Sequence, residues 1–279
     1  MRHGVAATGS RTVPEETAVA LVYDGSTHAV LMATPADLDD LGVGFSLTEG
    51  IASAGDIRDV EIVPGTDGIE CRIWLAPGLA AGLGERRRAI VGPTGCGLCG
   101  VESLAEAVRS PPRVTTSSFP AAEIAAAAAS LRGHQPLGDA TRAVHAAALW
   151  TRGGGLVCLR EDVGRHNALD KLAGALVRAG IDATGGIVVL TSRVSVEMVQ
   201  KTAHIGAGAI VAVSAPTALA IRTAIEAGLV LVGVARDDGF EVFAGAERVQ
   251  LPGLLVTPAQ AGAHTRPAVD TYGPPPARG

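Results

Sequence analysis

The sequence predicts an α/β protein, and two observations support this prediction. In the second half of the chain, short and continuously apolar segments such as 186–190 alternate with amphipathic segments such as 196–204. That alternation is typical of buried parallel strands covered by helices. Apolar residues make up 47% of the chain but aromatic residues only 3%. The core must therefore consist of Val, Leu, Ile and Ala, which suits closely packed strands and helices.

The first half of the chain predicts a small α+β unit. Alternating apolar residues indicate a strand pair that turns at Asp24-Gly25, since Asp-Gly is a strong hairpin signal. The segment Thr34-Pro35-Ala36-Asp37 predicts a helix start with Thr34 as the N-cap, and the helix should stop at Gly50. Two more strands are expected over 59–63 and 69–75.

The second half predicts the larger unit. After a linker over 113–120, the expected elements are a helix over 121–131, a hairpin of 144–150 and 156–160, a helix over 167–179, a strand over 186–190, a helix over 196–204, a strand over 209–213, a helix over 217–227 and a strand over 229–234. We expect a disordered N-terminus over 1–14, an α+β domain over 15–112, an α/β domain over 113–250 and a flexible tail over 251–279.

Charge and apolar runs narrow the class of protein. The formal net charge is -5, whereas nucleic-acid binders normally carry a basic excess. No apolar run reaches the length of a membrane span or follows the N-terminal charges as a signal peptide would. We therefore expect a cytoplasmic protein without nucleic-acid or membrane partners. In a reducing cytoplasm, paired cysteines are more often used for chemistry or metal binding than for structural disulfides.

The four cysteines fall into two kinds. Cys71 and Cys158 lie in apolar strand segments, which predicts buried thiols that act as small apolar side chains. Cys96 and Cys99 lie between glycines in the loop 92–100, just before a segment that predicts a helix. Free N–H groups at a helix start stabilise a thiolate, and a thiolate attacks disulfide or sulfane sulfur. The loop therefore predicts a reactive thiol.

Several other interpretations of this loop are open from the residues alone. A zinc site would need two further ligands, and no second Cys-x-x-Cys is present, although His145 or His166 could contribute through the fold. A thioredoxin-like pair would follow a first strand in a βαβ unit, and here a basic segment precedes it. A zinc deaminase needs His-x-Glu, but the chain has His145-Ala146-Ala147.

A second candidate site is expected where the parallel strands end, because ligands bind beyond the carboxyl ends of such strands. Two of these ends precede helix starts, which suit phosphate oxygens. The run Arg160-Glu161-Asp162-Val163-Gly164-Arg165-His166-Asn167 concentrates functional groups between a strand and a helix. The residues that these strand ends and this run offer to a ligand are Ser192, Arg193, Ser214, Arg165, His166, Arg236, Asp237, Asp238 and Gly239.

Taken together, the motifs resemble the FdhD family of formate dehydrogenase accessory sulfurtransferases. The motifs that carry the resemblance are Gly44-Phe45-Ser46-Leu47-Thr48-Glu49-Gly50, the loop 94–100, His145-Ala146-Ala147-Ala148, the run 161–172, Ser192-Arg193 with 197–201, and 212–217. They occur over residues 15–245. The chain departs from the family pattern at Arg142-Ala143, where a glycine pair is usual, and at Asp238-Gly239-Phe240, where Gly-Arg is common.

The resemblance implies a sulfur carrier that takes sulfur from a cysteine desulfurase. The sulfur would pass to the molybdenum bis(molybdopterin guanine dinucleotide) cofactor before its insertion into formate dehydrogenase. By the same resemblance, Cys96 carries the persulfide with Cys99 as its partner. The resemblance also places Val234 and Ala235, together with residues 236–239, in the cofactor-binding stretch, and it adds His145 to the site. The resemblance also implies a cytidine deaminase-like second domain and a homodimer. The alternative is a chaperone that binds the cofactor without transferring sulfur.

Overall fold

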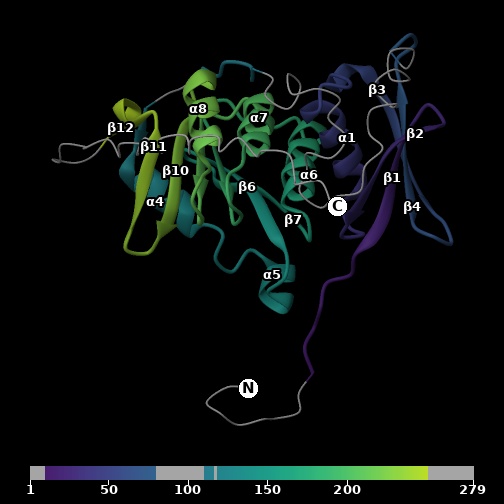
Figure 1. The fold of residues 1–279 in the computed structure, drawn as a ribbon, viewed down its shortest axis with the longest axis horizontal. Helices are drawn as coiled ribbons and strands as arrows, with labels where there is room; N and C mark the ends of the chain where they lie inside the picture. The colour runs from purple at the N-terminus through teal and green to yellow at the C-terminus, as the bar shows by residue number, and fades with distance from the viewer. Residues whose placement is uncertain (1–9, 80–109, 116–117, 251–279) are drawn as a thin grey trace, which may run out of the picture.

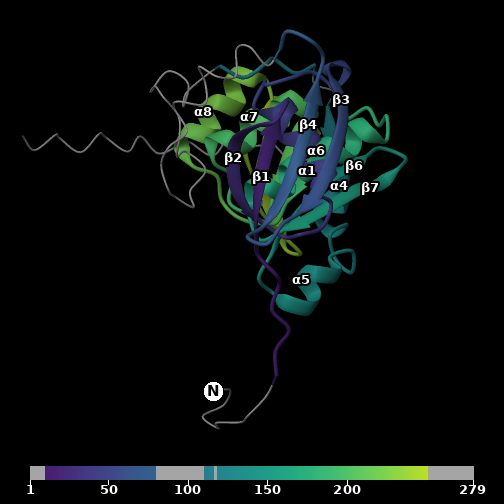
Figure 2. The same ribbon diagram turned by 90° about the vertical axis from the view of Figure 1, so that its right-hand side faces the viewer.

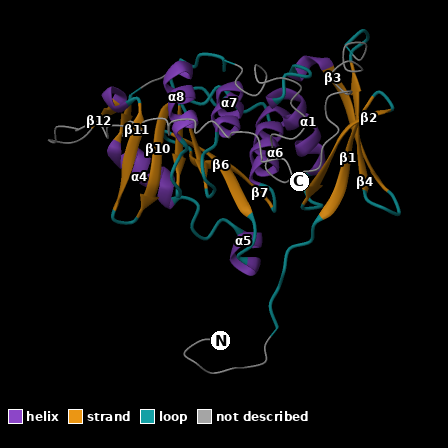
Figure 3. Ribbon diagram, viewed as in Figure 1, coloured by secondary structure: helices purple, strands orange, loops and turns teal. Residues whose placement is uncertain are grey.

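Two β-sheets stand on either side of a crossing pair of helices, α1 (Leu38–Thr48) and α6 (Arg165–Arg178). This is a computed structural model, and it describes residues 10–79, 110–115 and 118–250. In Figures 1 and 3 the smaller sheet lies to the right of the two helices and the larger one to the left. The predicted α/β class is confirmed by this arrangement of sheets and helices. The likeness of the second part to a cytidine deaminase stays a prediction.

The smaller sheet has the strand order β2-β1-β4-β3, and Figure 2 views it face on. Its strands are β1 (Thr17–Tyr23), β2 (Ser26–Ala33), β3 (Ile57–Pro64) and β4 (Ile69–Leu75). The turn at Asp24-Gly25 has positive φ at both residues, 45° and 81°. Such a turn matches the right-handed twist of the two strands that it joins. The four predicted strands and their order along the chain are confirmed.

The predicted cap of α1 is wrong. The N-cap residue is Asp37, in the left-handed conformation and without a side-chain cap, and the helix begins at Leu38. The Thr34 hydroxyl instead accepts a hydrogen bond from the backbone N–H of Val163, at 3.1 Å. A long-range contact thus replaces the local cap that the sequence predicts. The predicted end before Gly50 is confirmed.

The larger sheet has the order β11-β10-β9-β8-β6-β7. Its strands are β6 (His145–Thr151), β7 (Gly155–Asp162), β8 (Ile187–Leu190), β9 (Ala209–Ala212), β10 (Val230–Arg236) and β11 (Gly239–Ala244). Strands β8, β9 and β10 are parallel, and the hairpin β6–β7 joins this sheet through an antiparallel pairing of β6 with β8. Strand β11, which the sequence did not predict, pairs with β10 through a turn at Asp237-Asp238.

Helices cover both faces of the larger sheet. Helices α6, α7 (Val196–Ile205) and α8 (Ala218–Ala227) pack on one face, and α4 (Ala121–Ala129) packs on the other. The short elements are α5 (Pro136–Thr141), η1 (Ala54–Asp56), η3 (Ala246–Arg248), and the pair β5 (Phe119–Pro120) with β12 (Val249–Gln250). No helix in the described part of the chain has the length and apolar character needed to span a bilayer.

The crossing of α1 and α6 brings the two helix backbones into direct contact. A Cβ atom on Gly44 would collide with the carbonyl group of Asp170, and one on Gly174 would collide with the carbonyl group of Asp40. No side chain fits at these two positions unless the helices move apart. Because α1 packs on the smaller sheet and α6 on the larger one, this contact fixes the distance between the two sheets.

We therefore predict that Gly174→Ala destabilises the protein. Alanine favours a helix interior by about 1 kcal/mol over glycine, but overpacking at a contact of this kind costs roughly 1–3 kcal/mol or more. Urea denaturation should show a lower free energy of unfolding. Gly55→Ala is the matched control, because a Cβ there meets no atom within 4 Å. An unchanged or raised stability of Gly174→Ala would contradict the close crossing.

Candidate functional site

The carboxyl ends of the strands in the larger sheet come together at one edge, which we call the carboxyl edge. It comprises the ends of β7, β8, β9 and β10, the start of β6, and the first turns of α6, α7 and α8. The sequence-predicted residues at this edge are His145 at the start of β6, Arg165 and His166 in α6, Ser192 and Arg193 after β8, Ser214 after β9, and Val234, Ala235, Arg236, Asp237, Asp238 and Gly239 at the end of β10 and in its turn. The fold thus places all twelve at the edge where parallel sheets bind ligands.

Hydrogen bonds and a backbone bridge join neighbouring segments along the carboxyl edge. From β6 to β10 these contacts are the backbone N–H of Ala146 to Thr191 Oγ1 at 2.9 Å, an isolated bridge between Val194 and Pro216, and the backbone N–H of Val234 to Ser214 O at 3.3 Å. The loops after β8 and β9 are therefore held in place by one another, so that the edge forms one surface.

Val234 carries backbone strain at this edge. Its φ is 51°, in the left-handed region, which a β-branched residue rarely adopts. The strain coincides with a break in the pairing of β10 with β11 between Gly233 and Arg236. Strained residues of this kind gather at ligand sites, where the surrounding structure holds them. Asp237, in the following turn, forms an ion pair with Arg132 from the end of α4.

The two histidines of the edge are held neutral. Burial and then the charge of Arg165 lower the pKa of His145. Burial, followed by the charges of Arg165 and Lys201, lowers the pKa of His166 to about 3. At neutral pH both imidazoles are therefore uncharged, and each offers one N–H and one lone pair. This suits hydrogen bonding to a ligand better than attraction of an anion.

A carboxylate that the sequence interpretation gave no role lies beside His166. Glu197 sits in the first turn of α7, and its Oε2 accepts a hydrogen bond from Ser195 Oγ at 2.6 Å. The same oxygen lies 3.7 Å from His166 Nε2. In a sequence, Ser followed by an acid at a helix start indicates only helix capping. The spacing of Ser195 and Glu197 therefore carried no signal of contact with His166.

The first two residues of the run 160–167, Arg160 and Glu161, connect separate elements of the fold. Glu161 accepts hydrogen bonds from the backbone N–H groups of Leu137 and Gly138, at 3.0 and 2.7 Å, and so caps α5. Arg160 pairs with Asp40 of α1 at 2.7 Å. The partners of these two residues come from other elements of the fold, and a site spanning the whole run stays a prediction.

Asp162 lies at the centre of a fully buried network between the two sheets. Its Oδ2 accepts hydrogen bonds from Lys171 Nζ at 2.6 Å and from the backbone N–H of Thr34 at 3.0 Å. Its Oδ1 accepts from the backbone N–H of Gly164 at 2.7 Å and from Asn167 Nδ2 at 3.0 Å. Lys171 and Asp162 both have 0% side-chain exposure. Each oxygen of this buried carboxylate thus accepts two hydrogen bonds, and these offset the cost of its desolvation.

A second buried lysine joins α1, α6 and α7. Lys201 Nζ contacts Asp170 Oδ1 at 2.8 Å and Glu49 Oε1 at 2.6 Å, and it lies 5.5 Å from the ring centroid of Phe45. Burial lowers the pKa of Lys201, but the carboxylates of Asp170 and Glu49 outweigh it and raise that pKa overall. Lys171 and Lys201 are the only lysines in the sequence. Both are buried in ion pairs at the junction of the two sheets.

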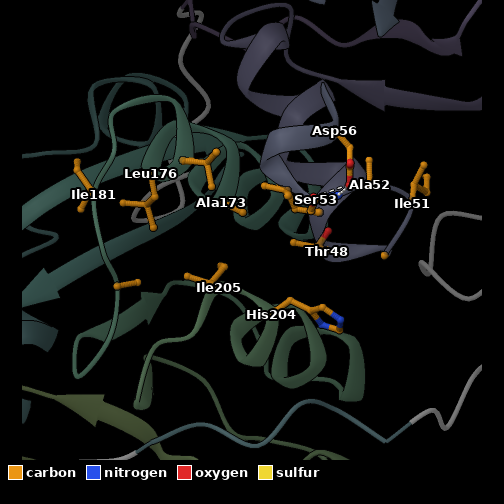
Figure 4. A pocket seen from close by; sticks show the side chains of 14 residues that line it. Thr48, Ile51, Ala52, Ser53, Asp56, Ala173, Leu176, Ile181, His204 and Ile205 are labelled. Carbon is orange, nitrogen blue, oxygen red and sulfur yellow. Dashed lines mark hydrogen bonds between the residues drawn. The ribbon is translucent and has the colours of Figure 1, made fainter. Parts of the chain in front are cut away.

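Two pockets lie away from the carboxyl edge. One, of about 490 Å³, opens between the C-terminal ends of α1, α6 and α7, with Leu176, Ile181 and Ile205 in its wall and His204 at its rim (Figure 4). In the wall of this pocket the hydroxyl of Ser53 donates a hydrogen bond to the carboxylate of Asp56. The other, of about 690 Å³, lies along β7. None of the twelve predicted residues at the carboxyl edge lines either pocket, whereas Arg160 and Glu161 of the run 160–167 line the second one.

The cysteine predictions have different outcomes. Cys71 is fully buried as predicted, and its burial raises the pKa of the thiol to about 12. Cys158 packs against the core of the larger sheet but is only half-buried, because β7 is an edge strand, so it is less buried than predicted. Cys96 and Cys99 lie outside the described residues. Their roles stay predictions.

Comparison with known proteins supplies the context for this site. The profile of the FdhD/NarQ family matches residues 14–250, which is most of the chain. The chain belongs to the FdhD/NarQ family. The resemblance drawn from the sequence motifs is therefore confirmed, and the matched region includes both sheets and the whole carboxyl edge.

Individual relatives agree with this membership. The chain is 53% identical over 254 residues to the sulfur carrier protein FdhD of Agrobacterium fabrum (strain C58), covering 90% of this chain and 94% of the relative. It is 52% identical over 241 residues to the sulfur carrier protein FdhD of Cupriavidus necator, covering 85% and 83%. A crystal structure from Desulfotalea psychrophila, of a protein assigned as a formate dehydrogenase accessory protein, superposes with a TM-score of 0.66 at 28% identity, covering 86% and 91%.

The buried networks predict that Lys171→Met is strongly destabilising. The substitution leaves the Asp162 carboxylate buried without its cationic partner, which typically costs about 3–5 kcal/mol. Urea denaturation should show this loss of unfolding free energy. Arg222→Met, which removes an exposed cation of α8, should change stability by less than about 0.5 kcal/mol. Equal effects of the two substitutions would contradict the network.

The burial of both lysines also predicts their chemical behaviour. An amine-acylating reagent should leave Lys171 and Lys201 of the native protein unmodified, because their side chains are 0% and 5% exposed. Peptide mass spectrometry after brief treatment measures this, and the urea-unfolded protein, in which both lysines should react, is the control. Rapid acylation of either lysine in the native state would refute the burial.

Proposed function

We propose that the chain is a sulfur carrier for formate dehydrogenase maturation in the cytoplasm. Cys96 accepts a sulfane sulfur from a cysteine desulfurase and delivers it to molybdenum bis(molybdopterin guanine dinucleotide). The observation that carries the proposal is the 53% identity, over nearly the full length, to a relative named as a sulfur carrier protein. The accessory-protein assignment of the structural neighbour supports formate dehydrogenase as the recipient. The family resemblance further suggests a homodimer.

The first chemical step is an exchange between sulfur atoms. The Cys96 thiolate attacks the outer sulfur of the desulfurase persulfide, so that a new S–S bond forms on Cys96. The S–S bond of the donor breaks, and its cysteine leaves as a thiolate. Cys99 is then the neighbouring thiol with two roles. Its thiolate either attacks the outer sulfur and takes it over, so that Cys96 leaves as a thiolate, or attacks Cys96 Sγ, which closes a Cys96–Cys99 disulfide and releases the outer sulfur as sulfide to the cofactor. The reduced thiols that this step requires are maintained in the cytoplasm.

The cofactor is the substrate of this reaction, and the carboxyl edge supports its binding. The edge carries groups suited to the pyrophosphate and to the heterocycle of a guanine dinucleotide. Exposed Arg193 and Arg236 offer charge to pyrophosphate oxygens. The neutral imidazoles of His145 and His166 offer hydrogen bonds to a heterocycle. The α8 start has no acid in its first turn, with Thr217 as a bonded N-cap, so its dipole favours an anion.

The proposal predicts that sulfur is loaded on Cys96 and that this loading is required. After the protein is mixed with a cysteine desulfurase and L-cysteine, mass spectrometry should find the mass of one added sulfur atom on the peptide that carries Cys96. In cells that lack their own carrier, Cys96→Ala should leave formate dehydrogenase as inactive as no carrier at all. Cys158→Ser is the matched control, because this half-buried thiol lies on β7, and it should restore activity fully.

A different pattern would favour a chaperone that only binds the cofactor. In that case Cys96→Ala would restore formate dehydrogenase activity, and Arg193→Ala or Ser214→Ala would abolish it. This outcome, or an absence of added sulfur on Cys96, would overturn the sulfur-carrier proposal. The binding role of the carboxyl edge would remain.

A further inference from the structure

The contact between Glu197 and His166 leaves two buried polar atoms without hydrogen-bond partners in the described part of the chain. Glu197 Oε2 accepts a hydrogen bond from Ser195 Oγ, but Glu197 Oε1 is buried and has no such bond within residues 10–79, 110–115 and 118–250. His166 Nε2 is likewise buried and unpartnered, 3.7 Å from Glu197 Oε2. Buried polar atoms without a partner are uncommon in native proteins and call for an explanation. Here the two atoms belong to neighbouring side chains, since His166 Nε2 lies 3.7 Å from the other oxygen of the same carboxylate.

The chemistry of the pair determines which way a hydrogen bond between them runs. An ionised carboxylate only accepts, so a bond to the imidazole requires the proton on His166 Nε2. In a neutral histidine the partner of one ring nitrogen fixes the tautomer, and the other nitrogen then carries the lone pair. Ser195 holds Glu197 in turn, which gives a chain of three groups from the start of α7 to the start of α6.

We propose that Glu197 is a positioning residue that keeps the proton of His166 on Nε2, so that His166 Nδ1 accepts a hydrogen bond from an N–H or O–H group of the ligand. This deepens the proposed function, on which it rests for the identity of the ligand. The class of group is one that guanine and pterin rings offer at their amide and amino edges. Of the two ring nitrogens, only Nε2 is enclosed without a partner, and the side chain keeps 18% exposure elsewhere.

The surroundings of His166 favour this role. Besides Glu197, the charged or titratable groups around it are Arg165, Lys201, Glu49 and His145. The burial of His166, followed by the net effect of these charges, lowers its pKa to about 3. The ring therefore keeps a lone pair at physiological pH. A separation of 3.7 Å is longer than a hydrogen bond, and bonds of this kind commonly tighten only when a ligand is bound.

Histidine-ring ¹⁵N NMR of the full chain measures the tautomer directly. The protein has seven histidines, and His166→Gln identifies the signal by its loss. We expect His166 to be protonated on Nε2 and to stay neutral at pH 6. Glu197→Ala should give a mixture of the two tautomers, whereas Glu197→Gln, which keeps an acceptor oxygen, should retain the Nε2–H form. A purely structural role of Glu197 would not produce this rescue.

The matched control is Glu226→Ala, which removes an exposed acid from α8 and should leave the His166 signal unchanged. A proton on Nδ1 in the unsubstituted protein would overturn the inference. So would a tautomer that is the same in Glu197→Ala, Glu197→Gln and the unsubstituted protein.

Binding of GDP, the guanine nucleotide part of the proposed cofactor, tests the ligand contact. Calorimetry should show about five- to tenfold weaker binding for His166→Gln and Glu197→Ala, the worth of one hydrogen bond, and unchanged binding for Glu226→Ala. Equal affinity of all four proteins, or no binding to the unsubstituted protein, would overturn the contact. Sulfur loading on Cys96 is measured separately, so its failure would remove the sulfur-carrier proposal while leaving this result intact.

Discussion

The rest of the structure depends on the contact between α1 and α6. Two glycines allow the helix backbones to touch, and the buried charges of Lys171 and Lys201 stand on either side of that contact. A buried ion pair is costly to desolvate and adds little net stability by itself, but it tolerates very few alternative arrangements. Lys171 of α6 donates to the carbonyl oxygen of Thr34, and Lys201 of α7 pairs with Glu49. Because both contacts reach into the smaller domain, they specify one position of the smaller sheet.

The same contact shapes the carboxyl edge. Asp162 ends β7 and receives the backbone N–H of Gly164, which fixes the entry into α6 and with it the places of Arg165 and His166. Lys201 lies one turn beyond Glu197 on α7 and also acts on the titration of His166. The junction that holds the two sheets together thus sets the electrostatics of the residues proposed to bind the cofactor. This gives one physical reason why the run 161–172 carries so many polar groups.

Much of the larger sheet could be predicted from the sequence, because β8, β9 and β10 are apolar on both faces and stand between amphipathic helices. The cap of α1 could not, since the hydroxyl of Thr34 is used by Val163, a partner 129 positions away. The roles of Asp162 and Glu161 were missed for the same reason: a run of charges shows its composition but not its partners. Strand β11 was missed because the acidic turn before it gave no clear strand signal.

The candidate site was predictable to the same extent. The rule that ligands bind at the carboxyl ends of parallel strands selected Ser192, Arg193 and Ser214, and the structure has these residues at the carboxyl edge. The proximity of Glu197 to His166 depends on how α6 and α7 pack, and no local pattern reveals it. The cysteine pair was recognisable from spacing and family resemblance alone, whereas the chemistry of its loop depends on Cys96 and Cys99, which lie outside the described residues.

Hydrogen exchange of the native protein tests most directly whether the two sheets form one body through α1 and α6. If the junction governs the structure, the amides of α1 and α6 should open together, with the free energy of global unfolding. A separate opening of α1 with the smaller sheet, at clearly lower free energy while α6 and β8 remain protected, would contradict this account.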